Sequence, residues 1–150
     1  MTLCDTNVIV SLADEADPIA SEYRKLADSI SGPLVTTWPC ITESIHIIGE
    51  RAKYKGDRWH KQKIVAKMLH LRFMTIYEVS QTDYFRLFSL MEEYRDRPMD
   101  LADASLVYTA EETGDSRILT TDLDFQFYRI NGRGSFEIPL SHLMVSKRRK

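Results

Sequence analysis

The chain has 150 residues, the usual length of one domain, and two domains sharing this length would each bury little core. Hydrophobic residues make up 43% and charged residues 28%, which excludes a disordered chain, a collagen and a disulfide scaffold. No apolar run approaches the ~20 residues that a membrane-spanning helix needs, and no secretory signal is visible. We therefore expect a cytoplasmic protein without a membrane partner, with Cys4 and Cys40 as reduced thiols.

The formal net charge of −2 hides a strong asymmetry along the chain. Residues 51–72 contain eight Lys or Arg and one acid, whereas residues 78–124 contain twelve Asp or Glu and four Arg. The total charge therefore excludes a uniformly basic nucleic-acid binder, but each of the two segments needs its own explanation.

Short apolar runs alternate with longer helical patterns along the whole chain. The predicted strands are 2–4, 34–36, 73–77 and 117–120, with a last short one at 136–138. The predicted helices are 17–29, 39–52, 58–71, from 80 or 82 to 95, and 100–112, the last ending before Gly114. This alternation predicts an α/β domain with a parallel sheet.

Six acidic residues share one kind of position, at the end of a predicted strand or the start of a predicted helix. They are Asp5, Glu43, Asp100, Asp103, Asp122 and Asp124. The carboxyl ends of parallel strands lie along one edge of a sheet, where such folds bind ligands. We therefore expect four separate segments to bring carboxylates to this edge.

Clustered carboxylates repel one another unless a cation neutralises them. Hard oxygen ligands select Mg²⁺ or Mn²⁺, and the scattered Cys and His residues have no zinc-binding spacing. Such sites mainly serve phosphoryl transfer or phosphodiester hydrolysis, in which the metal polarises the phosphate and activates a water. Each acid also has an ordinary structural explanation, such as an N-cap at Asp100 or loop acids at Asp122 and Asp124.

Four blocks of sequence resemble the motifs of PIN-domain ribonucleases, in the order and spacing of that family. The blocks are Cys4-Asp5-Thr6-Asn7-Val8-Ile9-Val10, Thr42-Glu43, Met99-Asp100-Leu101-Ala102-Asp103-Ala104-Ser105-Leu106-Val107 and Ile118-Leu119-Thr120-Thr121-Asp122-Leu123-Asp124-Phe125. Within the family, the chain is most similar to VapC-type toxins of bacterial and archaeal toxin–antitoxin pairs. The resemblance extends from residue 2 to about residue 140.

The resemblance implies a three-layer α/β/α fold with a central parallel sheet, and an endoribonuclease that depends on Mg²⁺ or Mn²⁺. It implies RNA as substrate, a homodimer and a small antitoxin as partner, in a hetero-oligomer. The implied catalytic and metal-binding set is Asp5, Glu43, Asp103 and Asp122, with Asp100 and Asp124 as secondary metal ligands. Thr6, Asn7 and Thr120 would orient carboxylates or water. Residues 1–140 would form the nuclease domain, followed by a basic tail at 141–150, for which disorder is the default expectation.

The basic helix predicted at 58–71 has two interpretations. Arg58, Lys61 and Lys63 could guide RNA phosphates, with Tyr54 and Trp59 stacking on unpaired bases. Alternatively, the segment is a solvated helix face with a buried Trp, or a contact to a partner protein. Two other functions also stay open, namely a PIN nuclease of RNA processing without an antitoxin, and a catalytically silent PIN-fold binding module.

Overall fold

The structure is a computed structural model that describes residues 1–146. Four short parallel strands form its sheet, in the order β3-β2-β1-β4. They are β1 (Thr2–Cys4), β2 (Leu34–Thr36), β3 (Met74–Ile76) and β4 (Ile118–Leu119). In the register, Leu3 pairs with Val35 on one side and with Ile118 on the other. Because β1 is a central strand, Asp5 leaves the middle of the sheet at its carboxyl edge.

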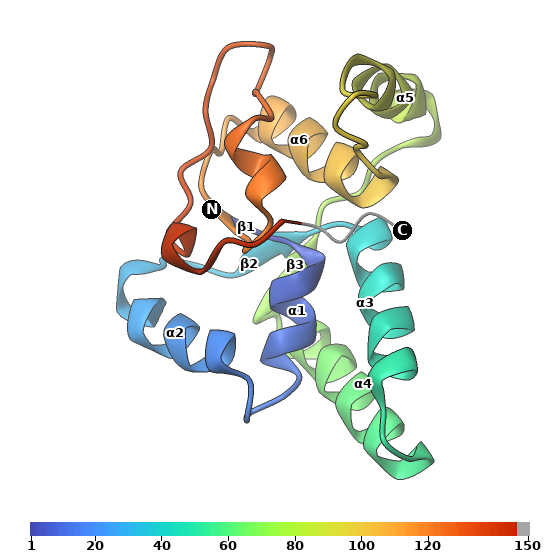
Figure 1. Ribbon diagram of the computed structural model, residues 1–150, viewed down its shortest axis with the longest axis vertical. Coiled ribbons are helices and arrows are strands. Elements are labelled where there is room, and N and C mark those ends of the chain that lie inside the picture. The colour runs from blue at the N-terminus through green and yellow to red at the C-terminus, as the bar shows by residue number, and fades with distance from the viewer. Residues whose placement is uncertain (147–150) are drawn as a thin grey trace.

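In the described residues, six α-helices flank the sheet and confirm the three-layer α/β/α architecture. They are α1 (Thr6–Leu12), α2 (Pro18–Leu26), α3 (Trp38–Arg51), α4 (Lys55–His70), α5 (Tyr84–Glu93) and α6 (Leu101–Thr113). In the view of Figure 1, α5 and α6 lie above the sheet and α1, α2 and α4 lie below it. Helix α3 packs against α1, α4 and α6. Within residues 1–146, no helix is long and apolar enough to cross a membrane.

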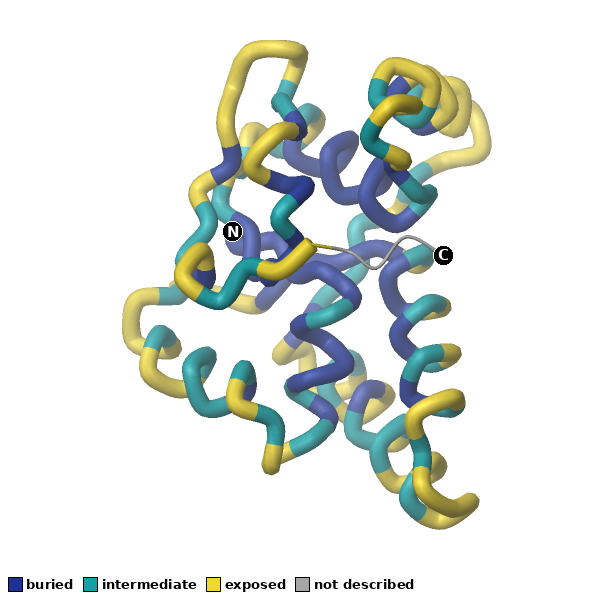
Figure 2. Tube along the Cα trace, viewed as in Figure 1, coloured by how far each residue is buried: buried dark blue, intermediate teal, exposed yellow. Residues whose placement is uncertain are grey.

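The core consists of the strands and the helices next to them, which form the dark blue centre of Figure 2. Helix α6 is buried along nearly all its length, from Ala102 to Ala110. Its small residues let it pack closely against α3 and α5 while it carries the buried Asp103. Gly114 ends α6 with a φ of 76°, a left-handed conformation that favours glycine.

Three elements differ from the sequence-based expectation. Helix α1 was not expected, because its seven residues are too few to show a helical period and its Asp5-Thr6-Asn7 start resembles a turn. Helix α4 begins at Lys55, three residues before the expected start. The negative charge of Asp57 in its first turn interacts favourably with the positive end of the helix dipole. The expected strand at 136–138 is wrong: Glu137 forms only an isolated parallel bridge with Arg117.

Candidate metal centre

Asp5 occupies the point where β1 turns into α1. Its backbone N–H donates to the carbonyl of Leu119 on β4 at 3.0 Å, so the sheet ladder fixes its position. One carboxylate oxygen, Oδ1, accepts from the backbone N–H of Thr6 at 2.7 Å and caps α1. The other, Oδ2, accepts from the Thr120 hydroxyl at 2.7 Å. The capping role and the orientation by Thr120 therefore use different oxygens of the same carboxylate.

Asp103 enters the site from the first turn of α6, where it forms a reciprocal cap with Asp100. The Asp103 N–H donates to Asp100 Oδ1 at 2.8 Å, and the Asp100 N–H donates to Asp103 Oδ2 at 3.5 Å. The hydroxyl of Tyr128 also donates to Asp103 Oδ2, at 3.2 Å, and Tyr128 is fully buried. The Asp103 carboxylate is thus oriented from its own helix and from a distant loop.

Asp122 and Asp124 follow β4, at the start of a short 3₁₀ helix, and their side chains have different surroundings. The Asp122 N–H donates to the Thr120 hydroxyl at 3.0 Å, and Asp122 Oδ1 accepts from the Asp124 N–H at 3.0 Å. Asp124 Oδ1 instead pairs with Arg97 Nη1 at 2.9 Å, and the Arg97 guanidinium stacks 3.6 Å from the ring centre of Phe127. The Asp124 charge is therefore neutralised within the protein itself.

The fold brings three of the sequence-predicted acids into one cluster. Asp5, Asp103 and Asp122 each place a carboxylate oxygen within 4.8 Å of the others. All three are buried, with exposed fractions of 3%, 1% and 2%. Because three carboxylates this close and this far from water repel one another strongly, a hard divalent cation fits the cluster. Their oxygen-only donor set suits Mg²⁺ or Mn²⁺ and does not suit a soft metal.

Glu43, Asp100 and Asn7 lie beside this cluster. A surface cleft, called the acidic cleft below, has walls that include Asp5, Asn7, Glu43, Asp100 and Asp103. Glu43 comes from the second turn of α3 and accepts a 3.0 Å hydrogen bond from the Thr6 hydroxyl. Asn7 Oδ1 accepts from the Thr121 N–H at 3.5 Å.

The end of the described chain lies against the same loop as Asp122. A 3₁₀ helix at Ser141–Leu143 is followed by Val145, whose N–H donates to Thr121 at 2.8 Å and whose carbonyl accepts from Leu123 at 3.1 Å. Backbone hydrogen bonds therefore join this part of the tail to the loop after β4. Residues 147–150 lie outside the described part of the chain.

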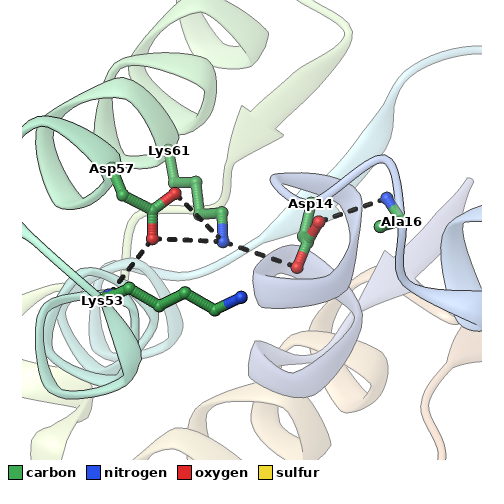
Figure 3. Close-up of polar contacts among 5 residues, drawn as sticks. All are labelled: Asp14, Ala16, Lys53, Asp57 and Lys61. Carbon is green, nitrogen blue, oxygen red and sulfur yellow. Dashed lines mark hydrogen bonds and ion pairs between the residues drawn. The ribbon is translucent and has the colours of Figure 1, made fainter.

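Lys61, one of the expected RNA contacts, takes part in a network of ion pairs. Its Nζ lies 3.5 Å from Asp14 and 3.4 Å from Asp57, and joins the loop after α1 to α4 (Figure 3). Partial burial alone would lower the pKa of Lys61, but the hydrogen bond and charge of Asp57 and the charge of Asp14 raise it. The ion pairs of Lys61 thus link the loop after α1 to α4.

Four other residues of the basic segment are more exposed to solvent than Lys61. Lys63 is exposed, and the Arg58 guanidinium packs over Gly49 of α3, where a Cβ would come within 3.2 Å of it. Trp59 is 67% exposed and Tyr54 is 70% exposed. The interpretation of this segment as a helix face with a buried Trp is therefore wrong for Trp59, and both aromatic rings face solvent.

Several residues of the site were not anticipated from sequence. Tyr128 and Arg97, which contact Asp103 and Asp124, belong to no block that resembles the family, and no local pattern marks them. His46 and Arg51 line the acidic cleft from α3. The sequence contains partial signals for both: they follow Glu43 on the same helix, and Arg51 begins the basic segment.

The sequence and the fold of the chain both resemble those of known proteins. The sequence matches the family model described as PIN domain over residues 2–132. A search of curated proteins finds no match. Among solved structures, the chain is similar to the crystal structure of VapC20 from Mycobacterium tuberculosis, described as a sarcin–ricin loop cleaving toxin. The two share 14% sequence identity with a TM-score of 0.66, over 79% of this chain and 87% of VapC20. The family match covers most of the sequence, and the chain belongs to the PIN domain family.

Proposed function

We propose that this protein is an endoribonuclease that hydrolyses RNA phosphodiester bonds with the help of Mg²⁺ or Mn²⁺. The observation that carries the proposal is the buried cluster of Asp5, Asp103 and Asp122 in a PIN-domain chain. These three residues would hold the ion, with Glu43 and Asp100 beside them in the acidic cleft. The chemistry supplied by such an ion is Lewis-acid polarisation of the phosphate and activation of water.

Neighbouring residues hold the three clustered carboxylates in position. Thr120 holds Asp5 and the backbone of Asp122, and the reciprocal cap with Asp100 holds Asp103. Glu43, tied to Thr6, adds a further carboxylate at the cleft, which can take up a proton from an attacking water. Asp124 is neutralised by Arg97 and therefore supports the loop, with a smaller part in holding the cation.

Basic side chains of α3 and α4 support RNA as the substrate. Arg51 lines the acidic cleft, and the exposed Lys63 lies on the neighbouring α4. Positive side chains attract the phosphate backbone, and binding through them weakens as salt increases. They also offset the repulsion between the acidic cleft and an approaching polyanion.

The proposal is tested with Asp103→Asn, which keeps the shape of the side chain and removes one charge. We expect the parent to cleave RNA with Mg²⁺ or Mn²⁺, and the variant to lose cleavage and most of its Mn²⁺ affinity by calorimetry. Glu112→Gln serves as the control, because this exposed residue is at the other end of α6. A variant that cleaves RNA as fast as the parent would refute the assigned site.

We further propose that the protein is the toxin of a toxin–antitoxin pair, a homodimer that a small antitoxin holds inactive. The resemblance to VapC-type toxins and the likeness of fold to VapC20 support this. We expect induced expression of the parent to arrest growth, Asp103→Asn to be harmless, and a small protein to co-purify from the native source. Cleavage without growth arrest or partner would favour a nuclease of RNA processing.

A further inference from the structure

An exposed tryptophan lies next to the acidic cleft. Trp38 is the first residue of α3, and 55% of it is exposed. Trp38 lines a second hollow, called the tryptophan hollow below, whose other apolar lining residues are Pro39, Leu101 and Ala102. The hollow is thus built from the first turns of α3 and α6, the same two helices that carry Glu43 and Asp103.

The tryptophan hollow adjoins the acidic cleft. Glu43, His46 and Asp100 line both of them. A polymer with one phosphate at the acidic cleft would therefore place its neighbouring unit in the tryptophan hollow.

The local structure holds the backbone at Trp38 in place. The preceding residue, Thr37, is fully buried and its hydroxyl lies 2.6 Å from the Ser105 hydroxyl on α6. The following residue, Pro39, has a φ fixed by its ring. The Trp38 carbonyl accepts a 3.0 Å hydrogen bond from the Thr42 hydroxyl. A platform whose backbone is fixed in this way loses little entropy on binding.

The chemistry of the tryptophan hollow selects its occupant. Its lining combines four apolar residues with Thr42, His46 and the carboxylates of Glu43 and Asp100. These acids repel a phosphate or an acidic side chain, but they accept hydrogen bonds from the N–H groups at the edge of a nucleobase. An indole offers a flat face on which any base can stack.

We propose that the tryptophan hollow binds the nucleobase next to the cleaved phosphate, stacked on Trp38. This inference rests on the proposed ribonuclease function and adds a specific subsite to it. Trp38, Pro39 and Leu101 also line a third hollow that includes Tyr77 and Tyr84. Further aromatic rings thus continue the surface away from the acids. A base in a duplex cannot stack on a protein ring, so the substrate is RNA with unpaired bases at the cleavage site.

The first test measures cleavage of a short single-stranded RNA by the parent, Trp38→Ala and Trp38→Phe. Loss of one stacked base typically weakens binding about 5- to 150-fold. We expect Trp38→Ala to raise KM by a factor in this range, and Trp38→Phe to retain most of the affinity. An RNA with an abasic nucleotide beside the cleaved bond should raise the KM of the parent by the same factor as Trp38→Ala does. The KM of Trp38→Ala should be the same for this RNA and for the intact RNA. Phe85→Ala, which removes a more exposed ring on α5, should cleave like the parent.

A second measurement does not depend on cleavage. The chain has two tryptophans, so Trp59→Phe leaves Trp38 as the single indole. In metal-free buffer, intact RNA should quench the fluorescence of this variant, and a fully abasic strand of the same length should not. The two assays separate the two proposals. Quenching in metal-free buffer, with no cleavage when Mg²⁺ or Mn²⁺ is added, overturns only the nuclease function. Cleavage with the metal, without quenching and with normal Trp38→Ala kinetics, overturns only the subsite. A changed oligomeric state of Trp38→Ala in light scattering would assign Trp38 to a subunit interface and also overturn the subsite.

Discussion

The Thr120 hydroxyl donates a 2.7 Å hydrogen bond to Asp5 Oδ2, across 115 residues of sequence. The same hydroxyl accepts from the Asp122 N–H at 3.0 Å. One buried side chain therefore sets the position of two of the three clustered acids. Thr120 itself is fully buried and directly follows β4.

Replacing Thr120 with valine should weaken both the fold and the metal site. Valine keeps the shape but leaves the Asp5 carboxylate without its charge-assisted donor, which costs about 1.5–3 kcal/mol of unfolding free energy. Loss of such a supporting contact typically lowers metal affinity about 10- to 100-fold. Urea unfolding and Mn²⁺ calorimetry measure the two effects.

Thr109→Val is the matched control for this substitution. Thr109 is equally buried, and its hydroxyl donates to the Ser105 carbonyl within α6 at 2.7 Å. The control should lose about 1 kcal/mol of stability and keep the Mn²⁺ affinity of the parent. Equal Mn²⁺ affinity in Thr120→Val and the parent would contradict a role for Thr120 in positioning Asp5.

Asp122→Asn and Asp124→Asn should differ although the two residues lie in one loop. Asp122 is in the cluster, so losing its charge should reduce Mn²⁺ affinity strongly. Asp124 is paired with Arg97, so Asp124→Asn should reduce Mn²⁺ affinity far less and mainly destabilise the fold. Thermal unfolding with and without Mn²⁺ shows both effects, since ligand binding to the native state raises its stability. Equal losses of the Mn²⁺-induced shift would show that both carboxylates hold the ion.

The sequence predicted the parallel α/β fold and the acids that converge, because both follow from local patterns. Apolar runs identified the four paired strands. Asp5 directly follows the first of them, and Asp122 lies three residues after the last. In a parallel sheet, that placement alone brings them to one edge. The expected helix at 100–112 likewise placed Asp100 and Asp103 together, as its capping geometry now explains.

Long-range contacts were beyond the reach of such patterns. Nothing near Tyr128 indicates that its hydroxyl reaches Asp103, and nothing near Arg97 indicates that it neutralises Asp124. Helix α1 was missed because a seven-residue helix depends on its packing against α3, and short helices are unstable alone. The exposure of Trp59 was likewise unreadable, since the helical period alone does not say which face meets the core.

Lys61 and Lys63 should respond differently to substitution by methionine. Lys61 forms ion pairs with Asp14 and Asp57, whereas Lys63 is exposed. Lys61→Met should therefore lower the thermal unfolding temperature with little change in RNA affinity at moderate salt. Lys63→Met should leave the unfolding temperature unchanged, weaken RNA binding and reduce its salt dependence. A larger loss of RNA affinity in Lys61→Met than in Lys63→Met would reverse this assignment.

The buried thiols should make the protein less stable as the pH rises above about 9, where unfolded cysteines ionise. Burial, with the nearby charge of Asp5, raises the pKa of Cys40 to about 12 and also raises the pKa of Cys4. Between these limits the native state holds protons that the unfolded state has lost, so unfolding becomes more favourable with increasing pH. The urea concentration at which half of the protein is unfolded should therefore decrease as the pH is raised from 8 to 9.5. The decrease should be smaller in Cys40→Ala. Native thiols should also react slowly with an alkylating reagent at pH 8, and rapid labelling of Cys4 and Cys40 without urea would contradict their burial.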